Sequence, residues 1–390
     1  MTDAPRYLFL NRAPGLNWNQ NRPASISDAL FVEPLAAVAT KGTSNLRLGL
    51  SFILSVLDGS EATLAQTLQG LLALSEKHDA PVLFVLDGQN WWNARPDLWN
   101  WWDETRPGYN PANRENVEWT GPGPDYAVKL CWRNWGRQIR VLPAPNLHAP
   151  RYRRAVTDAM TPFLRQIVAW KNTLPKTRRF LFPGVKVGWE ASIGINAYHY
   201  PNGNELLNQP PESDPQTGLE KTRDFAGGLV PLGYAALSSA GRTHPGSVTL
   251  ADHEFLTQNY LAFLSRLARG AGLKRNEVFT HVGGQYAPYH LHYTHRVAVN
   301  PDAIPGWSLY NTRPDEAGDL GQAVDAARTD GAWCAAEWLT NAKTADGWAD
   351  DIRRTLGFRN CRSLSVYNWE GVRSRPEALR GLQTVLNQGV

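Results

Sequence analysis

Two glutamates, Glu190 and Glu337, each close a run of apolar residues. The runs read Val185-Lys-Val-Gly-Trp-Glu190 and Ala332-Trp-Cys-Ala-Ala-Glu337. A carboxylate at the end of a buried strand lies where a sheet meets solvent, and two of them on one sheet can act on the same substrate. One carboxyl group then protonates a leaving oxygen while the other attacks a carbon or activates water, which is the chemistry of glycosidic-bond cleavage. The two glutamates are therefore predicted to form a catalytic acid/base pair.

Eight apolar, strand-like runs along the chain can position such a pair. They span Tyr7 to Asn11, Leu48 to Leu57, Pro81 to Leu86, Phe180 to Trp189, Val278 to Val282, Trp307 to Tyr310, Ala332 to Ala336 and Leu364 to Trp369. Helical patterns fill most gaps between them, at residues 61–77, 151–173, 251–269, 318–329 and 345–356. Eight apolar runs that alternate with helices predict an α/β fold, the (β/α)8 TIM barrel. The two glutamates then end the fourth and seventh strands and face one C-terminal mouth.

The predicted organisation is a single (β/α)8 catalytic domain over residues 1–390, with long loop insertions at about 88–148 and 191–249. Both insertions follow a strand, which puts them on the C-terminal face where barrel enzymes bind their substrates. The first insertion is rich in tryptophan interleaved with Asn, Asp and Arg. Sugar rings stack on indoles while their hydroxyl groups bond to such polar side chains. We therefore expect lids over a carbohydrate site.

Residues at or just past strand ends, and within the first insertion, are the candidates to contact a bound sugar. They are Asp87, Asn90, Trp91, Trp92, Arg133, Asn134, Trp189, His199, Gln285, Tyr310, Trp338 and Trp369. A polar residue at a strand end also often caps the following turn, which is the alternative role of Asp87.

Composition and charge argue against nucleic acid and membrane as partners. Of the 390 residues 42% are hydrophobic and 19% charged, which is typical of a globular chain, and the net charge is only +4. The cations are scattered, so we expect no nucleic-acid partner, and no apolar stretch has the length that crosses a bilayer. The first residues lack a signal-peptide pattern, and as given the chain is expected to be cytoplasmic. Its oligomeric state is left open.

No cofactor or metal is predicted. The sequence has no GxGxxG, GxxxxGK[ST], GxSxG or HExxH motif. His290, His292 and His295 lie among tyrosines in a segment that we interpret as a polar aromatic loop rather than a metal site. The three cysteines are spaced as free buried thiols: Cys131, Cys334 and Cys361.

Glutamates after the fourth and seventh strands resemble those of the retaining glycoside hydrolases of the large (β/α)8 clan that includes β-galactosidases, cellulases and β-mannanases. The resemblance implies that Glu190 is the acid/base, that Glu337 is the nucleophile, and that Trp369 floors the subsite of the cleaved sugar. That clan usually has Asn before its acid/base residue, and this chain has Trp189 there.

Other mechanisms stay open at this point. Gly188-Trp-Glu190-Ala-Ser192, followed by Tyr198-His-Tyr-Pro201, is similar to the β-amylase barrel, an inverting enzyme in which the same pair would be acid and base around a water. A carboxyl separation of about 5 Å indicates retention, and one of about 6.5 Å or more indicates inversion. A carbohydrate-binding barrel without catalysis is a further hypothesis, as is a metal-dependent hydrolase that uses the segment from His290 to His295.

Overall fold

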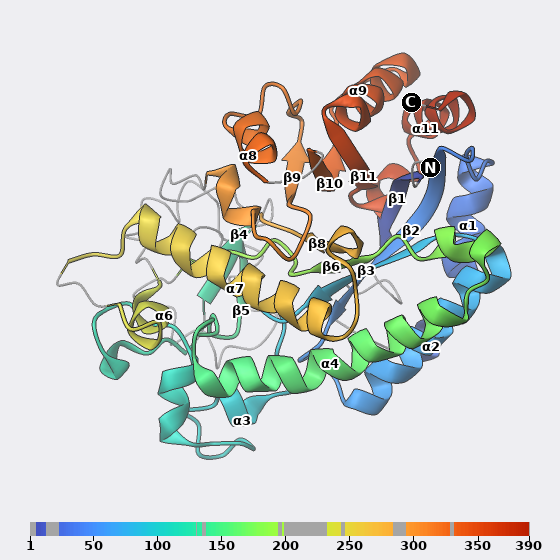
Figure 1. Cartoon of the computed structure of the whole chain (residues 1–390). Coiled ribbons are helices and arrows are strands. Elements are labelled where there is room, and N and C mark those ends of the chain that lie inside the picture. The colour runs from blue at the N-terminus through green and yellow to red at the C-terminus, as the bar shows by residue number, and fades with distance from the viewer. Residues whose placement is uncertain are drawn as a thin grey trace.

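The computed structural model describes residues 5–12, 23–129, 131–134, 138–193, 197–198, 232–242, 246–283, 294–327 and 331–389. Within these ranges eight strands pair in parallel and helices surround them, which confirms the predicted (β/α)8 TIM-barrel class (Figure 1). The strands are β1 (Arg6–Arg12), β2 (Leu46–Ser55), β3 (Val82–Asp87), β6 (Val185–Val187), β8 (Val278–Thr280), β9 (Gly306–Tyr310), β10 (Ala332–Leu339) and β11 (Asn360–Val366).

The strand order is β8-β6-β3-β2-β1-β11-β10-β9, and its two ends meet to make a nearly closed barrel. Isolated parallel bridges join Phe279 to Ile304 and Val282 to Trp307, across the seam between β8 and β9. Gly306 stands at this seam, where a Cβ atom would come within 2.4 Å of the Cys334 sulfur. A residue without a side chain is therefore needed where β9 closes the barrel.

Long helices cover the outside of the barrel. They are α1 (Ala29–Val38), α2 (Glu61–His78), α4 (Pro150–Thr173), α7 (Leu250–Gly270), α8 (Leu320–Ala326), α9 (Ala345–Gly357) and α11 (Pro376–Gln388). Figure 1 shows α2, α4 and α7 next to one another along one side, and α9 beside α11 on another. None of the helices in the described ranges combines the length and the apolar character that a membrane crossing requires.

Helix α2 illustrates how local sequence fixes these elements. The Ser60 hydroxyl caps its first turn by accepting a hydrogen bond from the Thr63 amide at 3.2 Å. Leu64, Leu68 and Leu71 recur at helical spacing and are buried against the barrel. The stripe that was visible in the sequence is thus the contact face of the helix.

Shorter elements lie in the connections between the barrel strands or after the last of them. They are α3 (Pro96–Trp99), β4 (Cys131–Asn134), β5 (Gln138–Val141), β7 (Ala197–Tyr198), α6 (Tyr234–Ser239) and α10 (Trp369–Val372), with 3-10 turns at Pro23–Ser25, Pro111–Asn116, Pro124–Tyr126, Lys176–Leu181, Arg275–Glu277 and His295–Ala298. Strands β5, β4 and β7 form a second, antiparallel sheet.

Several strand boundaries differ from those expected, and three of them bear on the site. The fourth run was expected from Phe180, but residues 176–181 form a 3-10 turn, so β6 begins only at Val185. The seventh strand continues to Leu339, so Glu337 lies inside β10 rather than after it. The eighth strand ends at Val366, and Trp369 begins α10. Helices α1 and α11 were not predicted.

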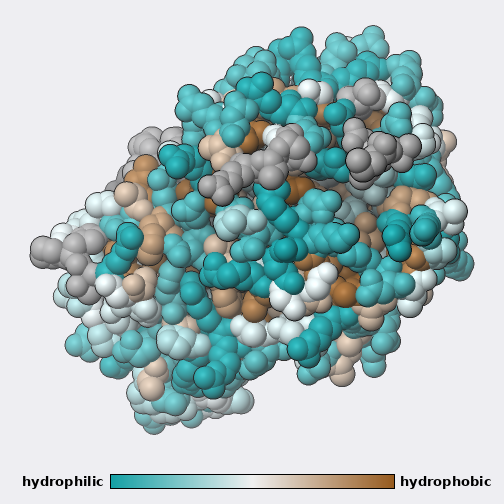
Figure 2. Space-filling model, in the orientation of Figure 1, coloured by the Kyte–Doolittle hydropathy of each residue, from teal (hydrophilic) through white to brown (hydrophobic). Residues whose placement is uncertain are grey.

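The barrel interior is apolar at the amino ends of the strands and polar at their carboxyl ends. Tyr7, Phe9 and Leu83 belong to a buried cluster at the amino ends, and Ile53, Val85 and Trp189 form the next cluster along. On the outer surface seen in Figure 2, hydrophobic residues appear as small separate areas among hydrophilic ones. The polar carboxyl end of the barrel is therefore the part of the interior suited to chemistry.

Candidate active site at the carboxyl end of the barrel

A bulge in β10 turns Glu337 into the barrel. In a regular strand, side chains alternate between the two faces, so an inward Cys334 would be followed by an inward Ala336 and an outward Glu337. The pairing of β10 with β9 and with β11 shifts register after Ala335. Ala336 packs with the interior cluster, and the Glu337 carboxylate also faces inward. One extra residue thus re-aims the glutamate, as bulges beside active sites often do.

The Glu337 carboxylate is 1% exposed and is surrounded by hydrogen-bond donors. Its Oε1 accepts from Asn11 Nδ2 at 3.2 Å and from Trp189 Nε1 at 2.8 Å. Its Oε2 accepts from the Tyr310 hydroxyl. Amide, indole and phenol groups from three different strands or strand ends therefore favour the ionised form of this carboxyl group.

Glu190 lies just past β6 with a left-handed backbone (φ +44°). A residue other than glycine in this region is strained, and such strain is concentrated at functional sites. Gly283 lies against its side chain, since a Cβ atom at 283 would be 2.3 Å from the Glu190 Cβ. The backbone conformation and the bare glycine together let Trp189 and Glu190, although consecutive, both face the mouth of the barrel.

A hydrogen-bonded chain holds the Glu190 carboxylate. His281 Nδ1 accepts from the Glu190 amide at 3.3 Å, so its proton is on Nε2, which donates to the Ser308 hydroxyl at 2.8 Å. Ser308 in turn donates to Glu190 Oε1 at 2.8 Å. Burial and the nearby Lys186 hold the pKa of His281 well below its usual value, so the imidazole is neutral.

The two glutamates are close enough to titrate as a pair. An oxygen of Glu190 and an oxygen of Glu337 lie within 4.8 Å of each other. Burial, and next the charge of Glu190, raise the pKa of Glu337 to about 8, although Lys186 and the donors from Tyr310 and Trp189 act in the opposite direction. Two carboxylates at this distance cannot easily both ionise, so the pair keeps one proton at neutral pH.

The same glutamates lie with His281 in an arrangement that could hold a metal ion. Glu190, His281 and Glu337 offer three ligand atoms within 4.8 Å of one another. Both His281 nitrogens are already engaged, and the buried Lys186 adds a positive charge beside the carboxylates. This chemistry favours a shared proton over a cation.

Asp87 and Asn90 build the turn after β3. Asp87 accepts from the Ser55 hydroxyl at 3.0 Å and from the amides of Gln89 and Asn90 at 3.0 and 3.1 Å. Asn90 Nδ2 donates to the Trp189 carbonyl oxygen at 2.7 Å. Here the capping role of Asp87 accounts for its contacts, and the turn supports the backbone that carries Glu190.

The predicted aromatic contacts fall into two groups. Trp91 packs beside Trp189 on the interior cluster with Ile53 and Val85, near the glutamates. The other indoles lie in the packing between elements. Trp92 donates to the Pro143 carbonyl oxygen, Trp338 donates to Thr355 of α9, and Trp369 is fully buried.

Four predicted contacts cannot be placed. His199 and Gln285 lie outside the described residues, as do His290 and His292. Arg133 and Asn134 belong to β4, whose backbone alone is described at these positions. His295 is placed, and its Nδ1 pairs with Asp319 Oδ1 at 2.5 Å.

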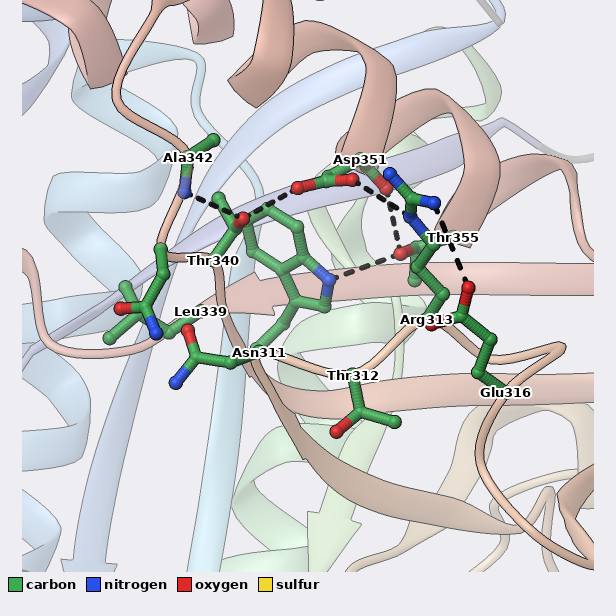
Figure 3. A pocket seen from close by; sticks show the side chains of 11 residues that line it. Asn311, Thr312, Arg313, Glu316, Leu339, Thr340, Ala342, Asp351 and Thr355 are labelled. Carbon is green, nitrogen blue, oxygen red and sulfur yellow. Dashed lines mark hydrogen bonds and ion pairs between the residues drawn. The ribbon is translucent and has the colours of Figure 1, made fainter.

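A separate pocket of about 310 Å³ lies between the ends of β9 and β10 and helix α9 (Figure 3). Its wall is braced by Asp351, which accepts from Arg313 Nε at 3.3 Å and from the Thr340 hydroxyl at 2.6 Å. Neither Glu190 nor Glu337 lines it. The pocket is thus distinct from the paired carboxylates.

Four residues of the site escaped the sequence reasoning: Asn11, Lys186, His281 and Ser308. Each is a polar residue in or at the end of an apolar run, so the signal was present. Lys186 is the clearest example, since a cation flanked by valines in a buried strand needs a partner.

Comparisons with known proteins complete the description. No family model matches the chain, and no curated protein matches it. Among solved structures, a GH5-4 broad-specificity endoglucanase from an uncultured bacterium is 9% identical, with a TM-score of 0.43 over 98% of this chain and 94% of that one. A glycoside hydrolase family 5 enzyme from Prevotella bryantii B14 is also 9% identical, with a TM-score of 0.42 over 97% and 95%.

Replacing the buried Glu337 carboxyl group should change how the stability of the protein depends on pH. The pKa of Glu337 goes from an ordinary 4.5 to about 8 on folding, so the coupled pair in the folded state holds a proton that the unfolded state releases between these values. Stability from this group therefore falls with rising pH, by up to about 1.4 kcal/mol per pH unit. We expect the melting temperature of Glu337→Gln to gain on the parent from about pH 5 to pH 8, measured by thermal unfolding.

The matched control is Glu316→Gln, whose carboxylate is exposed. Its melting temperature should follow that of the parent at every pH. A constant difference between Glu337→Gln and the parent would contradict the raised pKa.

Proposed function

We propose that this protein is a glycoside hydrolase that cleaves glycosidic bonds of an oligo- or polysaccharide with retention of anomeric configuration. In this proposal Glu190 is the acid/base and Glu337 is the nucleophile. The observation that carries it is the approach of one oxygen from each carboxyl group to within 4.8 Å, inside a buried barrel mouth. Retaining enzymes hold their carboxyl groups about 5 Å apart, whereas inverting ones leave about 6.5 Å or more for a water.

The environments of the two glutamates support the division of roles. Glu337 has three donors on its oxygens, and an anion held by donors is suited to attack. Glu190 has its Oε1 on the Ser308 hydroxyl, and in this proposal it carries the proton that the pair shares when substrate binds. The proton is then on the residue that must donate it.

The reaction follows from this arrangement. Glu190 gives its proton to the glycosidic oxygen as the bond to the anomeric carbon breaks, and a Glu337 oxygen bonds to that carbon from the opposite face. The aglycone leaves as an alcohol. Glu190, now ionised, takes a proton from water, whose oxygen displaces Glu337 and restores both carboxyl groups.

Trp189 replaces the Asn of the resembled clan and has a definite role in this scheme. Its indole N–H donates to Glu337 Oε1 at 2.8 Å, and its ring belongs to the buried cluster against which Trp91 packs. The indole thus helps to fix the nucleophile. Together with Trp91 it offers an aromatic wall for the apolar face of a sugar ring.

The anomeric configuration of the first product tests the proposal. Wild-type protein is incubated with a panel of glycosides and the anomeric proton signals are followed by NMR from the first minutes. We expect release of a sugar whose first-formed anomer has the configuration of the substrate. Initial release of the opposite anomer would establish the inverting scheme, and no hydrolysis across a broad panel would refute the function.

Removal of the nucleophile should be rescued chemically. Glu337→Ala should lose at least about 100-fold in turnover, because no covalent intermediate can form. With an activated glycoside and added azide, the anion should occupy the vacated space and yield a glycosyl azide of inverted configuration. Glu316→Gln should keep parental turnover and give no azide product. Full activity of Glu337→Ala would rule out the assignment.

Crowding of the acid/base residue should affect poor leaving groups most. Gly283→Ala would place a methyl group against Glu190 and displace its carboxyl group. We expect turnover of alkyl glycosides to fall by about 100-fold or more, and turnover of nitrophenyl glycosides to fall much less, because their aglycones leave without a proton. Gly357→Ala is the control, since a Cβ atom there meets nothing within 4 Å. Equal losses on both substrate types would argue against the acid role.

A further inference from the structure

Lys186 is a fully buried lysine in the barrel interior. It lies in β6, in register with Val85 of β3 and Phe279 of β8. Its Nζ donates to the Ala336 carbonyl oxygen at 2.6 Å. Removing an ammonium group from water is costly unless nearby charge or hydrogen bonds compensate for it. The position of Lys186 in an otherwise apolar strand therefore needs an explanation.

The acceptor of this hydrogen bond belongs to the β10 bulge. Ala336 is the residue at which the pairing of β10 shifts register, and Glu337 follows it. The lysine thus binds the backbone at the point where the strand turns the glutamate inward. Because Ala336 directly precedes Glu337, this bond attaches the ammonium group to the main chain one residue before the glutamate.

The titratable groups around Lys186 leave the glutamate pair as its main electrostatic partner. Burial lowers the pKa of Lys186, and Glu337, Cys334 and Glu190, in that order, act electrostatically in the opposite direction. Burial raises the pKa of Cys334 and keeps that thiol neutral, and His281 is neutral as described above.

The titratable groups at the mouth of the barrel do not provide another charged partner for the glutamate pair. Burial raises the pKa values of Tyr310 and Tyr367, so both phenols are neutral. Arg12 is the nearby cation at the end of β1, but its guanidinium pairs with Glu33 at 3.3 Å and with Glu370 at 3.2 Å. Lys186 is therefore the cation within the described residues that is directed to the pair.

We propose that Lys186 is a positioning residue whose buried positive charge favours the ionised form of Glu337 beside Glu190. The hydrogen bond to Ala336 holds that charge in place, and the charge acts on Glu337 through space. This inference rests on the proposed function only in giving the ionised Glu337 a task. Without the lysine, two buried carboxyl groups would share the site with no compensating cation, and both would tend to stay protonated.

The test is a titration of Glu337 in protein labelled with ¹³C at the glutamate side-chain carboxyl carbon. The Glu337 signal is identified by its loss in Glu337→Gln. Lys186→Gln keeps a hydrogen-bond donor for the Ala336 carbonyl oxygen but removes the charge, whereas Lys186→Met removes both. We expect the midpoint of Glu337 to rise by about one pH unit or more in both variants. The acid limb of kcat/KM for glycoside hydrolysis should move upward with it.

The control is Lys171→Gln, which removes a lysine that pairs with Glu277 on the outer helices and should leave the Glu337 midpoint unchanged. Lys186→Arg, which keeps the charge, should return the midpoint toward the parental value if it is accommodated. An unchanged midpoint in Lys186→Gln would overturn the proposal, and so would a shift in Lys186→Met alone, because the hydrogen bond rather than the charge would then be responsible.

A reciprocal measurement covers the case in which the Lys186 variants do not fold. Coupling between two titrating groups acts equally in both directions. In protein labelled with ¹⁵N at the lysine side chains, Glu337→Gln should lower the Lys186 midpoint relative to wild type, and an unchanged midpoint would refute the coupling. Neither titration needs turnover. A coupled titration without glycoside hydrolysis would therefore refute the proposed function alone.

Discussion

Two carboxyl groups held almost out of water within 4.8 Å of each other are the constraint on which the rest of this barrel depends. Each group loses hydration and repels the other when ionised, so the surroundings must supply what water no longer does. Donors from Asn11, Trp189 and Tyr310 serve Glu337, and the His281–Ser308 chain serves Glu190. The polar residues of the barrel interior are distributed according to these needs.

The scaffold meets this constraint through two departures from regular strand geometry. Strict alternation would turn every second side chain away from the mouth. At Ala336 a bulge returns the Glu337 side chain to the interior. At Glu190 a left-handed backbone lets its side chain face the mouth of the barrel, as that of Trp189 does. Gly283 provides the space that the second departure requires. Both irregularities occur where a side chain is needed for the proposed chemistry, as expected when local strain is compensated by the surrounding fold.

Much of the fold was predictable because parallel barrel strands are buried on both faces and appear as continuous apolar runs. Residues 82–87 and 332–339 are such runs, and their order placed Glu190 and Glu337 at the fourth and seventh strands. The start of β6 was not predictable, because Phe180 to Pro183 is as apolar as a strand although it forms a turn and its continuation. The direction of Trp338 was not predictable either. If side chains alternated without a break after Cys334, Trp338 would point inward. The bulge sends it toward α9 instead.

The site was predictable in its acids and less so in their supports. A glutamate after an apolar run can be recognised in the sequence. The hydrogen-bond partners of Glu337 come from positions 11, 189 and 310, which only the folded structure brings together. His281 and Lys186 were visible as polar residues in apolar runs, but their functions depend on register across β6, β8 and β10. For Asp87 the local rule of turn capping accounts for the hydrogen bonds from Ser55, Gln89 and Asn90, and its contact with a sugar stays a prediction.

The bond from Trp189 to Glu337 has a consequence for how such a site can change over time. Residues 189 and 190 are consecutive, so a single peptide unit carries both the acid/base candidate and an anchor of its partner across the barrel. The position of this peptide therefore affects both carboxyl groups. A substitution that moves it displaces Glu190 and also the indole that binds Glu337, so position 189 should accept new side chains only together with compensating changes near position 337.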